Sequence, residues 1–437
     1  RSTPLYSSAA SDVYKRQKLF QLTLFACLRA GGSKKAPMIA ECELRSHFAD
    51  NAIAGKDNQL GADNPMQITQ EFDGGNIVVL GGGNSDEICL EIRSDQSSDF
   101  YQWFYFRLSG AKDSRCQIRV LNAAGAAYPD GFRDYRVCYS YDRENWLRHE
   151  TDLTDGVLSF DFVSGHDSVY FAYFAPYSIE RHHRLIAEAQ TAAHCSHRLL
   201  GQTLDGQDLD LLRFSLEQDI SKPGDRKQCW FIARQHPGET MAEWWMEGAI
   251  RRLLNARDAL TRTILQSCDL YLIPNMNPDG SRRGHLRTNA AGRNLNREWV
   301  NPAMESAPEV FLAKQAMADT GVDFFMDVHG DESLPYCFIA GTEGLAGWDD
   351  ADQAQLEYYR EHLAALNPDF QTEYGYPAKD PGEANMSMST AQTAGLYNCL
   401  AMTLEMPFKD TSATPDPVYG WSPERSAYLE ESCLQAM

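Results

Sequence analysis

A change in hydrophobic pattern near residue 177 constrains the fold more than any other feature of this 437-residue chain. From about Met66 to about Tyr177, short alternating segments are separated by turn residues. Several short strands at this spacing are typical of an all-β sandwich, which we predict over residues 66–177. The segments are GNIVVLGG, EICLEIRS, FYQWFYFRLSG, CQIRVLNAAG, YRVCYSYDR, VLSFDFVSG and SVYFAYFAPYS.

Beyond residue 177, strand-like runs alternate with helical runs. The segment PYSIERHHRLIAEAQTAAHCSH is interpreted as a helix that marks the boundary. This alternation implies an α/β domain over residues 178–437, with a mostly parallel mixed sheet flanked by helices. The strand-like runs are LDLLRFSL, QCWFIAR, CDLYLIPN, VDFFMDVHG, PYCFIAG and CLAMTLE, and the helical runs lie near 241–255, 308–318, 351–366 and 423–434.

The first 65 residues lack this patterning and are excluded from the fold. RSTPLYSSAASDVYKRQ resembles translated sequencing-adapter sequence. KLFQLTLFACLRA is apolar enough for the core of a signal peptide, but it lacks an A-x-A-like cleavage site and lysines follow it. We therefore expect residues 1–65 to be a non-native or disordered leader, with the native start at Met66 or Met38.

Charge and cysteine usage exclude several classes of partner. The formal net charge of −21 argues against nucleic acid and against an anionic membrane surface. No apolar run approaches the roughly 18 residues of a membrane span. The eleven cysteines are scattered and form no C-x-x-C pair, which indicates reduced, mostly buried thiols in a cytoplasmic protein.

Chemically active side chains follow four of the predicted strands. In an open α/β sheet, ligands bind at the carboxyl ends of the strands, so residues just past those ends should meet at one rim. QCWFIAR is followed by His236 and Glu239, VDFFMDV by His329, and CLAMTL by Glu405. CDLYLIPN is followed by NPDG and an arginine-rich loop. Chance explains a single His-x-x-Glu spacing, but four independent placements are hard to attribute to it.

The two histidines and the first carboxylate form a ligand set for catalytic zinc. Such zinc takes three protein ligands from nitrogen and carboxylate oxygen and keeps one position for water. His236, Glu239 and His329 supply this set. Zinc lowers the pKa of its water to about 7 and polarises a carbonyl, and Glu405 is the carboxylate available as general base. An arginine can stabilise the oxyanion, and another can clamp a substrate carboxylate.

The loop that carries the first pair of ligands has its own local signals. Pro237 and Gly238 should keep it out of helical geometry. Thr240 and Glu243 match a capping box, T-x-x-E, which predicts that a helix begins just after Glu239.

At this point a family resemblance becomes specific. The matching motifs are HPGE, NPDG, R-x5-R-x2-NR within RTNAAGRNLNRE, DVHG and TLEMPF. With them, residues 178 to 437 resemble the M14 family of zinc metallocarboxypeptidases, in the cytosolic carboxypeptidase-like subfamily of bacterial type. FAYFAPYS is similar to the N-terminal sandwich of that subfamily. The resemblance covers nearly the whole chain after Met66.

The resemblance implies a role for each matching residue. One zinc ion would be held by the ligand set named above, and Glu405 would be the general base. Arg287 would stabilise the developing oxyanion, while Asn296 and Arg297 would grip the C-terminal carboxylate of the substrate.

Two positions depart from the family pattern. The family often has an aspartate before LNR that orients the first zinc histidine, and Asn294 stands here instead. An amide oxygen can accept the histidine N–H, but it carries no charge and leaves the ligand less basic. The family tyrosine near the substrate has three candidates, Tyr374, Tyr376 and Tyr397.

Other polar clusters have plainer interpretations. The histidines on the boundary segment suggest a second metal site. Histidines that face solvent from a helix are commoner, however, and we favour that interpretation. The remaining loop arginines are interpreted as solvated or salt-bridged. Asp327 is a buried partner for a loop amide or arginine, or else a catalytic group. These residues are His182, His183, His194 and His197, and Arg282, Arg283 and Arg293.

We therefore expect a zinc-dependent exopeptidase that removes C-terminal amino acids from peptides or protein tails. The resemblance suggests glutamates, although the acidity of the chain opposes long-range attraction of acidic tails. The floor of the pocket is expected within DPGEANMSMSTAQTAG. The alternatives are an N-acyl-amino-acid deacylase of the desuccinylase and aspartoacylase type, and a non-catalytic binder of peptide tails. The sequence leaves the oligomeric state open.

Overall fold

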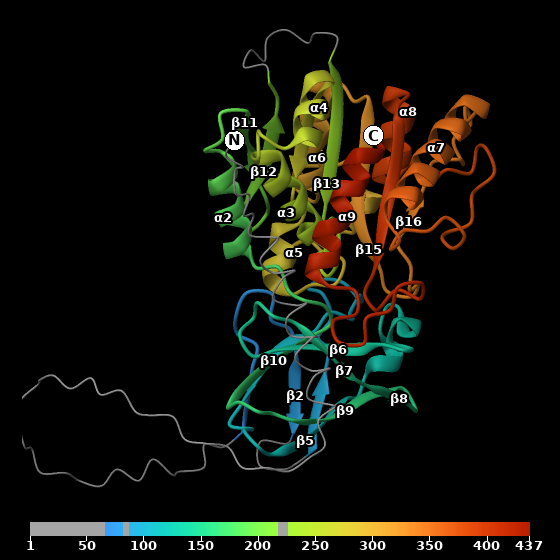
Figure 1. Cartoon of the computed structure of the whole chain (residues 1–437). Helices are drawn as coiled ribbons and strands as arrows, with labels where there is room; N and C mark the ends of the chain where they lie inside the picture. Colours follow the sequence, from blue (N-terminus) through green and yellow to red (C-terminus); the bar gives the residue numbers. More distant parts are fainter. Residues whose placement is uncertain (1–65, 82–86, 217–225) are drawn as a thin grey trace, which may run out of the picture. The chain divides into compact units, whose positions relative to one another are not determined.

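The computed structural model describes residues 66–81, 87–216 and 226–437 (Figure 1). The expected leader, residues 1–65, lies outside the described residues. Among the described residues, no helix is long and apolar enough to cross a membrane. No disulfide joins their cysteines.

The β-rich part contains two five-stranded sheets among the described residues. Most neighbours are antiparallel, although β3 and β5 run parallel. The aromatic residues 103–106 are 2 % exposed or less and lie in the core. One sheet orders β1 (Gln67–Thr69), β4 (Tyr105–Ser109), β10 (Ser168–Ala172), β6 (Arg136–Ser140) and β7 (Leu147–Glu150); the other orders β2 (Val78–Gly81), β3 (Glu87–Glu91), β5 (Arg115–Val120), β9 (Val157–Val163) and β8 (Asp152–Thr154).

The second part is built on a seven-stranded mixed sheet. Its four central strands are parallel, and antiparallel strands flank them at both edges. The carboxyl ends of the parallel strands therefore meet at one edge, as the sequence predicts. In spatial order the strands are β11 (Cys195–Gln202), β12 (Asp208–Phe214), β14 (Cys268–Ile273), β13 (Lys227–Ala233), β15 (Phe324–Asp331), β17 (Leu400–Pro407) and β16 (Phe338–Ala340).

Helices cover this sheet, and the four predicted runs are confirmed to within a few residues. Figure 1 shows α3 beside α9, and Gly248 permits that approach because a Cβ there would lie 2.4 Å from the Ala427 carbonyl oxygen. The helices are α2 (Ile179–Ala189), α3 (Thr240–Leu254), α4 (Ala259–Ser267), α5 (Pro278–Arg283), α6 (Pro308–Thr320), α7 (Asp350–Leu366), α8 (Ser389–Tyr397) and α9 (Pro423–Ala436).

The boundary helix is shorter than predicted. It ends at Ala189, and the residues that follow a short turn form the edge strand β11 instead. This strand alternates only weakly between buried and exposed side chains, because only one neighbour pairs with it and much of it faces solvent. Its sequence therefore lacked the strand pattern that the central strands display.

The predicted capping box at the start of α3 is wrong. The N-cap residue is Glu239, and no side chain caps the first turn. Thr240 donates its hydroxyl to the Ala175 carbonyl oxygen (2.9 Å). Glu243 is fully buried and accepts a 2.5 Å hydrogen bond from Arg234. A buried cation therefore draws this carboxylate inward, away from the helix terminus.

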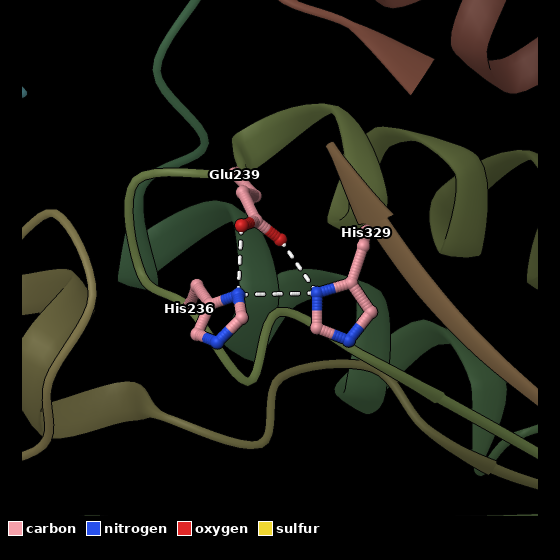
Figure 2. A group of neighbouring side chains, drawn as sticks. All are labelled: His236, Glu239 and His329. Atoms are coloured by element: carbon pink, nitrogen blue, oxygen red, sulfur yellow. Dashed lines mark hydrogen bonds and ion pairs between the residues drawn. The ribbon is translucent and has the colours of Figure 1, made fainter. Parts of the chain in front are cut away.

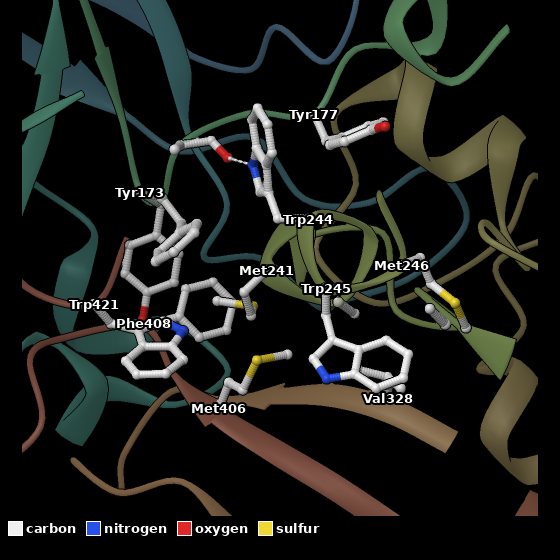
Figure 3. Close-up of a cluster of buried hydrophobic side chains, with 14 of the residues drawn as sticks. Tyr173, Tyr177, Met241, Trp244, Trp245, Met246, Val328, Met406, Phe408 and Trp421 are labelled. Carbon is white, nitrogen blue, oxygen red and sulfur yellow. Dashed lines mark hydrogen bonds between the residues drawn. The ribbon is translucent and has the colours of Figure 1, made fainter. Parts of the chain in front are cut away.

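One hydrophobic cluster runs from the β-rich part into the α/β part. Figure 3 shows Tyr173, Phe408 and Trp421 together with residues of α3. Tyr173 and Phe408 stack with ring centroids 4.6 Å apart. Arg148 of the β-rich part also donates hydrogen bonds to the carbonyl oxygens of Phe408 (2.7 Å) and Trp421 (3.0 Å). The two parts thus share buried apolar and polar contacts close to the carboxyl end of β17.

Candidate active site

His236, Glu239 and His329 form a compact buried cluster at the edge of the sheet (Figure 2). His236 and Glu239 follow β13, and His329 lies on β15. Glu239 Oε1 lies 2.7 Å from His236 Nδ1, and Glu239 Oε2 lies 2.8 Å from His329 Nδ1. The two Nδ1 atoms are 3.2 Å apart. Three ligand atoms from two separate segments therefore converge on one point.

The far side of each imidazole ring contacts a different kind of group. His236 Nε2 lies 3.1 Å from the amide oxygen Oδ1 of Asn294. His329 Nε2 lies 2.8 Å from the carboxylate oxygen Oδ2 of Asp327. These contacts turn both Nδ1 atoms toward the cluster. Asp327 is thus a buried partner of a histidine, and it also accepts hydrogen bonds from Gln235 (2.5 Å) and Ser389.

Close packing of two loops and the helix α5 sets the position of His236 and Glu239. A Cβ on Gly238 would lie 2.9 Å from the Leu286 carbonyl oxygen, which also accepts the Gly238 N–H (2.9 Å). Gly280, the glycine of NPDG, would place a Cβ 2.4 Å from the Pro237 ring. Only glycine allows these approaches without displacement of the loop.

Arg234 braces the same loop from behind. It is buried with a φ of +57°, and it donates hydrogen bonds to the carbonyl oxygens of Pro237 and Tyr177 (both 3.0 Å). A non-glycine residue in this backbone region is strained by itself, so the surrounding contacts must hold it there.

The electrostatics of the cluster favour a bound cation. Burial, reinforced by Arg287, lowers the pKa of His236 to about 4, so this imidazole is neutral at pH 7. Burial opposes ionisation of Glu239, but the two imidazoles outweigh it and hold its pKa below the usual range. Burial also opposes a charged His329, but Asp327 and Glu239 raise its pKa well above the usual value. The carboxylates of Glu239 and Asp327 thus stabilise a positive charge in the cluster, which a proton on His329 or a metal ion could supply.

The donor set fits zinc. Ligands about 2.0–2.2 Å from a tetrahedral zinc ion lie roughly 3.3 Å from one another, and two imidazole nitrogens with one carboxylate are a common catalytic set. The 3.2 Å between the two Nδ1 atoms matches that separation. Among the described residues, this is the one group of three or more potential ligands with the spacing of a metal site.

Glu405 lies beside the cluster. It is paired in register with His329 on the adjacent parallel strand, and it is 6 % exposed. Its Oε2 has no hydrogen-bond partner among the described residues. Burial raises its pKa well above the usual value, and Glu239 adds to this, whereas His329 opposes it. A cation in the cluster would lower this pKa, because an opposite charge favours the ionised form.

The arginine-rich loop supplies the cations of the site. Arg287 Nη1 lies 4.0 Å from Glu239 Oε1. Asn296 and Arg297 belong to the 3-10 turn Leu295–Arg297. Asn296 accepts the backbone N–H of Ser389 (2.9 Å), and Arg297 donates to the Asn296 carbonyl oxygen (2.6 Å). The turn is therefore tied to the start of α8 across the pocket.

All seven residues singled out in the sequence line one cavity of about 460 Å³. The structure thus brings together groups from the ends of β13, β15 and β17 and from the loop that lies beyond β14. They are His236, Glu239, Arg287, Asn296, Arg297, His329 and Glu405.

Of two tyrosines in the cavity, the sequence named one as a candidate and did not indicate the other. Tyr376 donates its hydroxyl to Asp331 (2.6 Å) and lies 3.4 Å from Glu405 Oε1. It was one of three candidates; Tyr374 instead stacks on Tyr336, and Tyr397 packs against a separate hydrophobic cluster. Tyr128 comes from the β-rich part, where no sequence signal marked it as a cavity residue.

The remaining polar clusters form no second metal site among the described residues, but of the four histidines only His183 is the solvent-facing helix residue that we expected. His182 is buried, and His194 and His197 lie beyond the end of α2 and are partly buried. His182 contacts Glu243 (2.7 Å), and His197 contacts Asp210 (2.6 Å), without the spacing of a metal site. Two of the loop arginines form ion pairs, Arg283 with Asp205 and Arg293 with Glu298, each at 2.7 Å.

Comparison with known proteins agrees with this architecture. A family model described as zinc carboxypeptidase matches residues 184–431, and one described as cytosolic carboxypeptidase N-terminal domain matches residues 68–174. The chain belongs to the M14 zinc carboxypeptidases and carries the N-terminal domain of the cytosolic carboxypeptidases. It is a metallocarboxypeptidase, a hydrolase of the exopeptidase class.

Individual relatives support the same assignment. An uncharacterised protein of Zymomonas mobilis is 50% identical over 370 residues, which cover 84% of this chain and 95% of that protein. Cytosolic carboxypeptidase 6 of Caenorhabditis elegans is 26% identical, with 77% of each chain covered. A metallo-carboxypeptidase of Pseudomonas aeruginosa, solved in complex with (2-guanidinoethylmercapto)succinic acid, is similar with a TM-score of 0.81 and 41% identity over 85% of this chain and 97% of that one.

Proposed function

We propose that this metallocarboxypeptidase uses one zinc ion, held by His236, Glu239 and His329, and that Glu405 is its general base. The observation that carries the proposal is the convergence of the three ligand atoms beside a buried carboxylate oxygen of Glu405 that has no partner among the described residues. A bound zinc ion would supply Lewis acidity, which acidifies water and polarises the scissile carbonyl.

Glu405 moves the proton in this mechanism. Its free Oε2 takes a proton from the attacking water as the water oxygen bonds to the carbonyl carbon. The same proton then passes to the leaving nitrogen as the C–N bond breaks. The products are a shortened peptide and a free amino acid, and Glu405 returns to its ionised form.

The two arginines bind the two negatively charged groups of the reacting substrate, its C-terminal carboxylate and the oxyanion that forms at the scissile carbonyl. Arg297 and Asn296 hold the C-terminal carboxylate of the substrate, since a guanidinium matches a carboxylate with two parallel hydrogen bonds. Arg287 donates to the oxyanion that forms at the scissile carbonyl. Binding at the carboxylate fixes which peptide bond reaches Glu405, so one residue is removed at a time.

We propose glutamate as the preferred C-terminal residue. Arg360 and Lys379 line the cavity, and the buried hydroxyl of Thr342 has no partner among the described residues. These groups suit a side-chain carboxylate, although Glu343 pairs with Arg360 at 3.1 Å and offsets part of its charge.

A basic C-terminal residue is the competing candidate. The succinic acid derivative bound by the Pseudomonas aeruginosa relative has two carboxylates and a guanidinium. In this chain Glu343 would meet such a guanidinium. A peptide series with each residue at the C-terminus, compared by kcat/KM, separates the two candidates: glutamate should rank first, and a preference for arginine or lysine would replace our choice.

Glu405→Gln tests the mechanism. The isosteric variant should keep zinc at one ion per chain, measured by elemental analysis, and lose roughly 10²–10⁴-fold in kcat. Normal turnover on C-terminal peptides would refute the role of Glu405. Acetyl- and succinyl-amino acids assayed alongside should be poor substrates, which would argue against the deacylase. Zinc-dependent binding of peptide tails without cleavage would instead favour a non-catalytic binder of peptide tails.

We also infer a cytoplasmic location. The unpaired state of most described cysteines and the names of the cytosolic relatives support it. Separation of cell fractions, followed by detection of the protein, tests this directly.

A further inference from the structure

Asp95 of the β-rich part contacts the loop that carries Arg287. It is 3 % exposed and follows β3 by a few residues. Both of its carboxylate oxygens accept hydrogen bonds from residues 286–288. The donors are Leu286 N (2.6 Å), Arg287 N (2.9 Å), Thr288 N (2.9 Å) and Thr288 Oγ1 (3.0 Å).

Three consecutive N–H groups on one carboxylate fix a backbone closely. Hydrogen bonds to an ionised acceptor are roughly twice as strong as neutral ones, and those in a low-dielectric site are strengthened further. Residues 286–288 belong to neither a helix nor a strand, so no ladder of backbone hydrogen bonds holds them. Asp95 accepts the backbone N–H groups that carbonyl oxygens accept within helices and strands, and so it holds this segment in place.

The neighbours of Asp95 hold the same loop. Gln96 donates its backbone N–H to His285 Nε2 (3.1 Å), and His285 Nδ1 in turn donates to the Thr288 carbonyl oxygen (2.9 Å). A Cβ on Gly292 would lie 2.3 Å from the Ser97 carbonyl oxygen, so the two backbones approach directly. Residues 95–97 of the β-rich part therefore contact this loop at several points.

The guanidinium of Arg287 is also supported from the β-rich part. Its Cζ lies 5.7 Å from the Phe100 ring centroid and 5.5 Å from that of Tyr128. Among the described residues, its one ion pair is the 4.0 Å contact with Glu239. Backbone and rings thus position this side chain and leave its N–H donors available to a substrate oxygen.

We propose that Asp95 is a positioning residue for the hydrolysis, acting through Arg287. This proposal rests on the role proposed above for Arg287 at the oxyanion. The β-rich part then supports transition-state stabilisation. A misplacement of about 1 Å in such a group can cost 10²-fold in rate.

A double-mutant cycle with Asp95→Asn and Arg287→Ala tests it. Asp95→Asn should lower kcat roughly 10- to 100-fold, with zinc content and the thermal unfolding midpoint close to those of the wild type. In the Arg287→Ala background, Asp95→Asn should lower kcat less than about threefold, because the group it positions is gone. Asp99→Asn, an exposed carboxylate in the same loop, is the matched control and should leave kcat unchanged.

Each outcome decides between the proposals. If Asp95→Asn lowers kcat equally in both backgrounds, Asp95 has a general structural role and our proposal for Asp95 is overturned. If Arg287→Ala lowers kcat and Asp95→Asn does not, only the proposal for Asp95 is overturned. If Arg287→Ala is fully active, the proposed role of Arg287 is overturned, and the proposal for Asp95 with it. Should Asp95→Asn not fold, Thr288→Val removes one bond to Asp95 and should give a smaller loss that also vanishes without Arg287.

Discussion

Two regions meet at the cavity, and they are held in different ways. The edge of the seven-stranded sheet supplies the ligand cluster and Glu405, and the loop 285–297 supplies the arginines. His329 and Glu405 are fixed by the register of β15 and β17. The loop lies outside the helices and strands except for the turn at its end, and it depends on Asp95 and on packing against the HPGE segment.

The difference suggests a division of labour. Groups on rigid strands are placed with the precision that a metal and a proton transfer need. Groups on the loop bind the substrate and its transition state. Substitutions of the zinc ligands, or of the residues that support them, should therefore change metal affinity or stability, whereas substitutions in the loop, like Glu405→Gln, should change turnover with the metal retained. Substitutions in each region test this division.

Arg287→Ala should show the loop effect most clearly. Loss of one oxyanion donor costs roughly 10²–10³-fold in kcat, and zinc content should not change. The measurement is steady-state kinetics together with elemental analysis. Arg293→Ala is the matched control, because Arg293 is exposed and pairs only with Glu298 among the described residues. Loss of zinc in parallel with activity would contradict the division between the two regions.

Buried His182, which contacts Asp210 and Glu243, should make the stability of the fold depend on pH. Burial opposes a charged His182, but its hydrogen bonds to Asp210 and Glu243 outweigh this and raise its pKa to about 9. A folded pKa above the unfolded value of about 6.5 stabilises the fold fully below pH 6.5, and this stability is lost as pH rises through about 9. The contribution is about 3 kcal/mol.

Urea unfolding at intervals from pH 6 to pH 9.5 measures this effect. The wild type should lose stability across the window, and His182→Gln should be less stable at pH 6 and lack that part of the slope. His183→Gln is the matched control, because His183 is the exposed neighbour on the same helix. A slope shared by the wild type and His182→Gln would place the titrating group elsewhere.

The same contrast explains what the sequence could predict. The ligand cluster and Glu405 follow strands with a clear local pattern, so their meeting point could be inferred from one topological rule. Arg287 and Arg297 came from motifs of the family, because loops carry no such pattern. Asp95 lies more than 190 residues before the loop that it contacts, and no local signal reports a pairing at that distance.

The errors have the same physical origin. The capping box at Thr240 was a correct local pattern, but tertiary contacts of Glu243 with Arg234 override it. The edge strand β11 was hidden because its solvent-facing side chains weaken the alternation. Sequence patterns thus sufficed where local and tertiary preferences agree, and failed where a distant partner decides or where exposure to solvent weakens the pattern.

Asp327→Asn should reveal how much the sheet edge depends on its supporting carboxylate. Removal of the charge behind His329 should weaken zinc binding roughly 10- to 100-fold, because outer partners of metal ligands tune them to that extent. Competition with a chromophoric chelator measures the affinity. Asp323→Asn, just before the same strand and paired with Lys227, is the matched control. Unchanged zinc affinity in Asp327→Asn would mean that this contact only orients the ring.

Asn294→Asp should produce the smallest effect, and in the opposite direction. An aspartate there would keep the contact with His236 Nε2 and the hydrogen bond from the Asn296 N–H, and would add a charge behind the first histidine. Zinc affinity should rise about 3- to 10-fold, since a more basic imidazole binds the cation more tightly. The double variant with Asp327→Asn should regain part of the lost affinity. If it does not, the charges behind the two histidines are not equivalent, and geometry rather than basicity distinguishes the two sides of the cluster.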